Sequence, residues 1–426
     1  MIMSLFVVIG LLLQIDDERA SPLTAIIDAT ELPSESDAYL YLLAIDSADN
    51  NKLIEQGRAI LQKAQQLGAN QTLNNTALQA LAPASENTKL ALVANELLCA
   101  YSQSSCLAYI FNNIDKIPSV LQSSELIIER YQTYLSFNDF KTLSEPLLSQ
   151  SIPPYQFMIR AARLINLKQL LAVSAAEQAI AVQALYDHHS ALRAQLILQD
   201  TLLGKMVILS LLSENIDFLS LLSAQFKVTV KEPLPALTIQ ERSLRSGFNR
   251  EIKMMSNMLE ALDGAPDIFK QQGVDAVSVP SWLTHILFKK NMTLNESYKL
   301  LDYYAMLSEM SVAKFEDEML KNQLKPTIEE HWLRNPIGSI LNQIATPDYS
   351  YYISHFWDMD NKIRLYNMHI NQPVTTAAMA PLNNVYRHAE QAEAYFMDAN
   401  TRWCFVSPYQ QQAKYNCLAV DVISKQ

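Results

Sequence analysis

Glycine is the residue whose scarcity most restricts the folds open to this chain. Only 8 of the 426 residues are glycine, whereas an average protein contains about 7%. Glycine most easily adopts the positive φ angles that tight hairpins and phosphate-binding loops require. The chain is instead rich in leucine and alanine, which are strong helix formers. We therefore predict an all-α protein.

Stretches with helical periodicity are separated by short polar joints. Apolar residues recur at helical spacing in 37–48, 51–67, 86–100, 116–136 and 153–172. Asn, Ser and Pro, rather than Gly, stand between these stretches. Helices of this length with short joints favour stacked αα-hairpins. Because the joints are irregularly spaced, we predict an irregular stack or helical bundle rather than a regular solenoid.

The stretch 198–222 is apolar enough to raise the question of a membrane span. Lys205 interrupts it, and Glu214 and Asp217 close it, so it lacks the 18 or more uncharged residues expected of a span. Its leucines and isoleucine recur at helical spacing, with polar residues between them. We predict a buried αα-hairpin whose joint is formed by residues 213–215.

Residues 227–239 differ from the helical stretches around them. Pro233 and Pro235 lie two residues apart, and a residue that precedes proline favours extended backbone. A chain of 426 residues also exceeds the usual size of one hydrophobic core. We therefore predict an N-terminal helical subdomain at 30–226, an extended linker at 227–239 and a C-terminal helical subdomain at 240–426.

Two further patterns concern the C-terminal half. From Leu294 to Met319, apolar residues alternate steps of four and three, which predicts one long helix packed along a partner. Residues 403–406 and 415–422 are rich in aromatic and β-branched side chains. These two stretches predict a small C-terminal β-hairpin.

The N-terminus begins with an apolar run. Residues 2–13 are apolar apart from Ser4 and Gly10, and the acidic stretch 16–18 follows. Twelve residues are fewer than the roughly 20 needed to cross a bilayer, but they match the apolar region of an export signal. We predict that residues 1–14 are a signal anchor or a signal-peptide core. The alternative is a buried first helix of a cytosolic protein.

The four cysteines form two pairs that are close in sequence, Cys99 with Cys106 and Cys404 with Cys417. On an unbroken helix, Cys99 and Cys106 would lie about 10 Å apart, whereas a disulfide needs Cα atoms within about 7 Å. Bonding therefore requires a turn in 101–105, which is polar. We predict two disulfides and an oxidising compartment. Four unpaired thiols are the alternative, and no CxxC pair indicates a zinc site.

The net charge of −11 and the pI near 5.2 bear on partners. Nucleic acids are bound mainly through Lys and Arg. The sequence has no basic run, so we expect no nucleic-acid partner.

Motifs for catalysis and for ligand binding are missing from the sequence. GxxxxGK[ST], GxGxxG, GxSxG and HExxH do not occur. An SxxK match at 311–314 has no accompanying KTG. The adjacent His188 and His189 diverge by about 100° on a helix, which fits a solvated helix end better than a metal site, and the neighbours in 329–331 diverge likewise. We predict no catalytic residues, no cofactor and no metal ligands.

The segment 348–360 is the strongest candidate for a binding surface. Tyr351, His355 and Asp358 recur at helical spacing, with Trp357 beside them. Aromatic rings next to a carboxylate suit a partner groove or sugar stacking. Packing in the core is the competing interpretation, because aromatic stripes at helical spacing are usually buried.

Four short motifs carry a family resemblance. They are Asp200–Met206, Glu241–Arg245, Asn291–Asn295 and Asn335–Leu341. In this order they resemble motifs of an uncharacterised family of helical envelope proteins of proteobacteria, over about residues 35 to 420. The resemblance implies a membrane-proximal helical protein with one N-terminal hydrophobic segment, and it brings no catalytic residues.

Together these features predict an exported protein that serves as a helical scaffold or protein-binding module of the cell envelope. We expect it on the periplasmic side of the inner membrane, or free in the periplasm if residues 1–14 are cleaved. Its expected partner is another envelope protein, and the membrane is contacted through the N-terminal segment only. The alternatives are a cell-wall hydrolase or glycan binder that uses acids such as Asp358 or Glu330, and an immunity or inhibitor protein.

Overall fold

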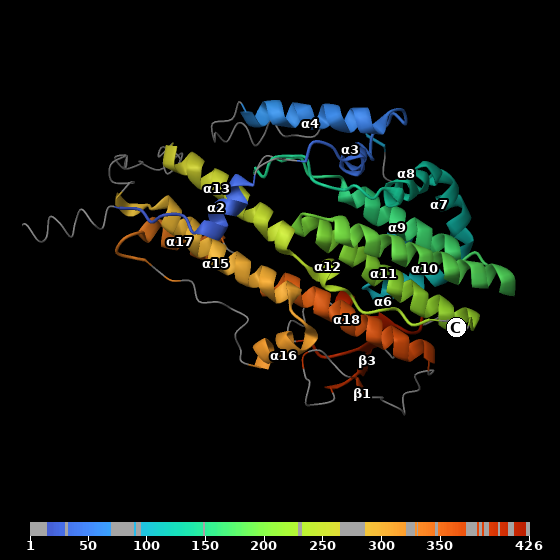
Figure 1. Ribbon diagram of the computed structural model, residues 1–426. Coiled ribbons are helices and arrows are strands. Elements are labelled where there is room, and N and C mark those ends of the chain that lie inside the picture. The colour runs from blue at the N-terminus through green and yellow to red at the C-terminus, as the bar shows by residue number, and fades with distance from the viewer. Residues whose placement is uncertain are drawn as a thin grey trace, which may run out of the picture.

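The predicted fold class is confirmed by the computed structural model (Figure 1). Helices dominate the described chain, and the described strands form two short antiparallel sheets near the C-terminus. The predicted anchor at 1–14 lies outside the described residues. The structure describes residues 15–29, 33–69, 89–90, 95–147, 150–228, 232–264, 286–320, 329, 331–345, 348–371, 381–382, 386, 392–398, 401–407 and 413–422.

Helix α11, Leu202–Phe226, runs through the centre of the molecule. It packs against α9 (Tyr155–Gln169), α10 (Ala175–Leu198) and α18 (Ser350–Asn371). Its length and composition would let it cross a membrane, but 94% of its apolar stretch is buried within the protein. The predicted burial is confirmed. The predicted hairpin joint at 213–215 is wrong, because α11 is one unbroken helix.

The first half of the chain contains further helices before α9. Those among the described residues are α2 (Ser21–Asp28), α3 (Asp37–Leu43), α4 (Leu53–Ala69), α6 (Ser104–Phe111), α7 (Ile117–Ser123) and α8 (Glu125–Ser136). Two 3₁₀ turns, η2 (Glu96–Leu98) and η3 (Ile114–Lys116), precede α6 and α7. At Gly57, α4 approaches α3 so closely that an added Cβ would meet the Leu40 carbonyl oxygen.

The second half contributes α12 (Ile239–Arg242), α13 (Arg245–Gly264), α15 (Lys290–Glu309), α16 (Val312–Leu320) and α17 (Pro336–Ala345). The predicted single helix from Leu294 to Met319 is wrong, because α15 ends at Glu309 and Met310 is extended. Tertiary contacts explain this end: the Met310 carbonyl accepts a hydrogen bond from Arg242, and the Glu309 carboxylate accepts one from Ser243.

The strands lie at the C-terminus. β3 (Tyr395–Met397), β4 (Arg402–Cys404) and β5 (Cys417–Ala419) pair antiparallel in that order. In this register Cys404 lies opposite Cys417. β1 (Pro381–Leu382) pairs with β2 (Ala392–Glu393), and the short α19 (Ala413–Asn416) precedes β5. The predicted C-terminal hairpin is β4–β5.

One hydrophobic cluster extends from Leu23 to Ala419 and includes residues from both halves of the chain. The stretch predicted as a linker packs against α18: the backbone N–H of Leu234 donates to Asn367, and that of Leu237 donates to Asp360. The division into two subdomains stays a prediction, but helices on both sides of 227–239 share this core.

Candidate functional site

A belt of polar side chains crosses the buried helix α11 near its middle. Its members, which we call the α11 polar belt, are Ser213, Glu214, Asn215 and Asp217, and each is at most 2% exposed. An isolated polar group in an apolar interior costs roughly 2–7 kcal/mol. Each member of the belt therefore needs a partner from another part of the fold.

Two acids of the belt pair with cations from two different helices. Glu214 accepts two hydrogen bonds from Arg163 of α9, at 2.8 and 2.6 Å. Asp217 lies 2.8 Å from Lys362 Nζ of α18, and these two side chains are at most 1% exposed. Charged pairs of this geometry are strong inside a protein. They tie α11 to α9 and α18.

The ammonium of Lys362 uses all three of its donors. Besides contacting Asp217, it donates to Ser213 Oγ at 2.9 Å and to the carbonyl of Lys414 at 3.0 Å. Burial lowers the pKa of Lys362 to about 8, and the neighbouring Asp217 opposes that shift. Lys362 is therefore charged at neutral pH, and the belt acts as a structural ion-pair centre.

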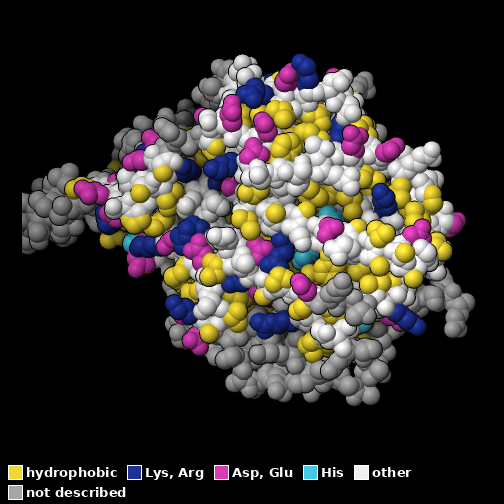
Figure 2. All heavy atoms as spheres, turned by 45° about the vertical axis from the view of Figure 1, so that its right-hand side comes forward, with side chains coloured by type: hydrophobic (Ala, Val, Ile, Leu, Met, Phe, Trp, Pro, Cys, Tyr) yellow, Lys and Arg dark blue, Asp and Glu magenta, His cyan; other side chains and the backbone are white. Residues whose placement is uncertain are grey.

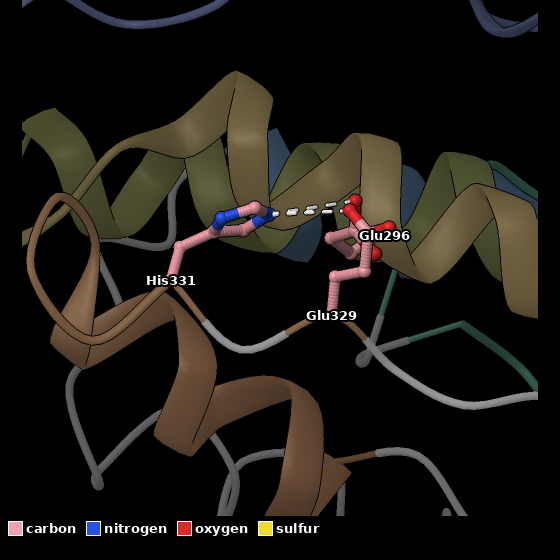
Figure 3. A group of neighbouring side chains, drawn as sticks. All are labelled: Glu296, Glu329 and His331. Atoms are coloured by element: carbon pink, nitrogen blue, oxygen red, sulfur yellow. Dashed lines mark ion pairs between the residues drawn. The ribbon is translucent and has the colours of Figure 1, made fainter.

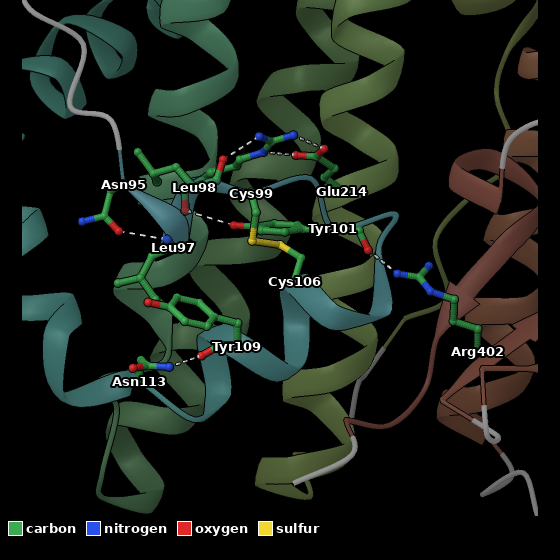
Figure 4. The surroundings of a disulfide bond; sticks show 11 residues. Asn95, Leu97, Leu98, Cys99, Tyr101, Cys106, Tyr109, Asn113, Glu214 and Arg402 are labelled. Carbon is green, nitrogen blue, oxygen red and sulfur yellow. Dashed lines mark hydrogen bonds and ion pairs between the residues drawn. A yellow bond between two sulfur atoms is a disulfide. The ribbon is translucent and has the colours of Figure 1, made fainter. Parts of the chain in front are cut away.

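Both predicted cysteine pairs are confirmed as disulfides, and Figure 4 shows the first of them, Cys99–Cys106. The Cα atoms lie 5.8 Å apart in Cys99–Cys106 and 4.0 Å apart in Cys404–Cys417. The first pair has the turn that its spacing required, because α6 begins only at Ser104 and a turn precedes it.

The two disulfide loops contact each other and α11. The Arg402 guanidinium, next to the second disulfide, donates to the Tyr101 carbonyl inside the first loop (Figure 4). The Tyr101 ring lies 4.8 Å from that of Phe218 on α11. On β5, the Ala419 backbone N–H donates to Asp217 at 2.9 Å. The disulfides and the α11 polar belt thus form one continuous network.

The predicted binding surface in 348–360 lies in the interior. His355 is 3% exposed, Trp357 0% and Asp358 4%, and Tyr351 is half-buried. Sequence periodicity grouped these side chains on one face of a helix. It could not show that α18 is covered on that face by other parts of the chain.

Aromatic packing accounts for two of these side chains. The Phe315 ring of α16 stacks on Trp357 with centroids 4.4 Å apart. The Tyr415 ring of α19 lies 4.3 Å from His355. Ring pairs at these distances stabilise a core, so the competing interpretation of this segment as packing is the one the fold supports.

Asp358 is held by hydrogen bonds in the same interior. It accepts one from the Tyr386 hydroxyl at 2.7 Å and one from Ser407 Oγ at 3.2 Å. Burial raises the pKa of Asp358 to about 7, and the two hydrogen bonds oppose that shift. A pKa near neutrality would suit a general acid, but this carboxyl group is enclosed by protein.

The adjacent histidines are also interior, and the expectation of a solvated helix end is wrong. His188 and His189 lie within α10 and are 6% and 2% exposed. The His188 ring lies 2.9 Å from the Tyr131 hydroxyl. Burial lowers the pKa of His188 to about 4 and that of His189 to about 3. Both rings are neutral at physiological pH.

One group of potential metal ligands occurs among the described residues (Figure 3). Glu296 of α15 approaches Glu329 and His331, and their ligand atoms lie within 4.8 Å of one another. Lys299 Nζ is 2.6 Å from Glu296 and 3.7 Å from Glu329. The Lys299 ammonium therefore supplies the positive charge that a metal ion would bring to these carboxylates. Glu330 lies outside the described residues.

A cleft of about 500 Å³ lies along one side of α13. We call it the α13 cleft, and its helical wall consists of Ser246, Asn249, Arg250, Lys253, Ser256 and Asn257. These positions share one helix face. Thr142, Glu145 and Asp200 contribute to the other walls.

The cations of the α13 cleft are anchored by carbonyl and amide oxygens. Arg250 donates to the Ser144 carbonyl and, at 2.9 Å, to Gln150. Lys253 donates to the Ala29 carbonyl at 3.0 Å. Burial lowers the pKa of Arg250. Hydrogen-bond donors and hydrogen-bond acceptors both face this cleft, which suits a polar segment of a partner protein.

The sequence carries one local signal for this cleft. Residues 246–257 place polar side chains on one face of a helix, opposite apolar residues such as Phe248 and Ile252, which are buried. The opposite walls come from distant segments and give no local signal.

No protein-family model, curated protein or solved structure matches the chain, so the family resemblance stays a prediction.

Proposed function

We propose that this protein is an exported helical binding module of a bacterial cell envelope, tethered to the inner membrane through residues 1–14. In this proposal it holds another envelope protein and catalyses no reaction. The two disulfides are the observation that carries the proposal. Disulfides persist in oxidising compartments such as the periplasm and are rare in the cytosol.

The buried charges favour a structural over a catalytic role for the interior. Glu214 and Asp217 are paired with cations, and Asp358 is enclosed by hydrogen-bonding partners. A hydrolase that uses Asp358 would need substrate to reach a side chain that is 4% exposed. The α13 cleft is accessible, and we assign partner binding to it. An inhibitor protein would use the same surface.

Compartment and disulfide state can be tested together. We expect thiol labelling of the denatured, unreduced protein, taken from cells, to modify no cysteine, and labelling after reduction to modify all four. A topology reporter fused after Gln426 is expected to be active only outside the cytoplasm. Free thiols in the extracted protein, or a reporter active in the cytoplasm, would contradict export.

Partner binding in the α13 cleft can be tested by site-specific photo-crosslinking in intact cells. We expect a crosslinking residue at Ser246, which is exposed in the cleft, to give one discrete heavier adduct. The same residue at Ile180 of α10, which is 69% exposed outside the cleft, is the matched control and gives none. Adding Lys253→Glu, which reverses a cleft charge, should remove the adduct. Equal adducts at both positions, or none at Ser246, would count against the cleft.

A further inference from the structure

Helix α17 packs polar side chains inward and leaves part of its apolar side exposed. Asn335, Ser339 and Asn342 are at most 5% exposed. On the opposite side of the helix, Ile340 is 42% and Ile344 78% exposed. Helices of water-soluble proteins normally show the reverse arrangement.

Specific contacts to α15 fix this orientation. Asn335 donates to Thr293 Oγ1 at 2.9 Å, and Asn342 accepts from Ser297 Oγ at 2.7 Å and donates to the Thr293 carbonyl at 3.1 Å. At Gly338 an added Cβ would overlap the Thr293 hydroxyl. α17 therefore cannot turn Ile340 and Ile344 toward the core without losing these hydrogen bonds.

The exposed apolar side chains of α17 continue onto the neighbouring turn and the start of the described chain. Trp332 is 50%, Leu333 81% and Ile15 59% exposed. Arg334, in the same turn, donates to the Ile15 carbonyl at 3.0 Å and pairs with Asp17. We call this group the α17 apolar patch; its members are Ile15, Trp332, Leu333, Ile340 and Ile344.

Chain connectivity places this patch beside the apolar N-terminal run. Residues 2–13 are apolar apart from Ser4 and Gly10, and Leu13 can lie at most about 7 Å from Ile15 at the length of two extended residues. Asp16 accepts hydrogen bonds from the backbone N–H groups of Asn291 and Met292, which fixes the start of the described chain to α15. Whatever apolar medium receives residues 2–13 therefore lies next to the patch.

We propose that the α17 apolar patch docks into the interfacial layer of the lipid bilayer that holds the N-terminal segment. This inference rests on the proposed membrane tether. Tryptophan prefers the bilayer interface, and an amphipathic helix lies in that layer with its apolar face toward the lipid tails. The protein then contacts the membrane through this patch as well as through the N-terminal segment.

Apolar burial, not charge, drives this docking. The cation beside the patch, Arg334, is paired with Asp17 at 2.8 Å. On the face shown in Figure 2, the Lys and Arg side chains are interspersed with Asp and Glu. Because the protein carries a net charge of −11, anionic phosphatidylglycerol adds no attraction, and docking is expected on vesicles of phosphatidylcholine alone.

Tryptophan fluorescence measures the depth of the patch. The full chain is reconstituted into vesicles of phosphatidylcholine that is brominated near the headgroup end of its acyl chains. The chain has four tryptophans, so the difference between wild type and Trp332→Phe isolates the signal of Trp332. We expect bromine to quench this signal strongly.

The patch is tested by Ile340→Ser combined with Ile344→Ser, which changes exposed positions and leaves the contacts to α15 in place. This variant should weaken docking about tenfold, measured as recovery of Trp332 fluorescence. Ile180→Ser, at an exposed isoleucine of α10, is the matched control and should change nothing.

The outcomes separate this inference from the proposed function. Vesicles that carry the protein but leave Trp332 unquenched would overturn the docking and leave the tether standing. A chain that fails to float with vesicles would overturn the tether itself. A patch-dependent dimer in sedimentation, without quenching, would assign the patch to a second copy and overturn the inference.

Discussion

We expect Asp217→Asn to lower the free energy of unfolding by about 3–5 kcal/mol, because the change leaves the Lys362 ammonium as an unpaired charge in the interior. Asp217 and Lys362 lie 2.8 Å apart, and their side chains are 1% and 0% exposed. Water cannot replace the lost carboxylate there. Urea unfolding with the disulfides intact, followed by circular dichroism, measures the loss.

A second change distinguishes loss of the ion pair from general damage. In Asp217→Asn combined with Lys362→Met, no charge is left unpaired. The asparagine carbonyl still accepts the backbone N–H of Ala419, and Ser213 Oγ still donates to the Lys414 carbonyl at 2.6 Å. The double variant should therefore recover most of the stability that the single variant loses, since apolar replacements of buried ion pairs are often neutral or stabilising.

The matched control is Asp302→Asn. Asp302 pairs with Arg245 at 2.8 Å, but these side chains are 44% and 39% exposed. An exposed ion pair contributes about 0–1 kcal/mol, so this change should be nearly silent. If Asp217→Asn and Asp302→Asn had equal effects, the α11 polar belt would not be a structural centre of this fold.

The α11 polar belt also shows how far sequence reasoning reached. Periodicity located the helix and its burial, because Leu209, Leu212 and Ile216 recur on one face. The polar residues 213–215 indicated a joint between two helices. Buried polar groups need hydrogen-bonding partners, and no such partner is close in sequence. Arg163 and Lys362 come from helices far along the chain, and only the tertiary structure brings them to Glu214 and Asp217.

The same distinction applies to the other sites. The cysteine pairs were predictable, because both partners are close in sequence and the spacing itself required a turn. The segment 348–360 was grouped correctly on one helix, but its exposure depended on Phe315 and Tyr415, which local periodicity cannot place. The outward apolar face of α17 follows from hydrogen bonds between Asn342 and α15, and hydrophobic patterning alone would have turned that face inward.

Removal of the second disulfide by Cys404→Ser with Cys417→Ser should lower the free energy of unfolding by about 3 kcal/mol. The chain-entropy model gives about 2.9 kcal/mol for a loop of 13 residues and about 2.4 kcal/mol for the 7-residue loop of Cys99–Cys106. Urea unfolding of each double variant measures these losses. By entropy alone the two disulfides are nearly equivalent.

Their positions in the network make the two variants differ in a second measurement. Cys417 begins β5, and Ala419 two residues later donates its backbone N–H to Asp217. Without the Cys404–Cys417 bond, β5 separates from α11 more often, so hydrogen–deuterium exchange should accelerate in peptides that contain Ala419. Cys99→Ser with Cys106→Ser leaves β4 and β5 covalently joined and should leave that exchange rate near wild type. Equal acceleration in both variants would mean that the second disulfide does not hold the sheet on the α11 polar belt, and that this junction depends on the fold as a whole.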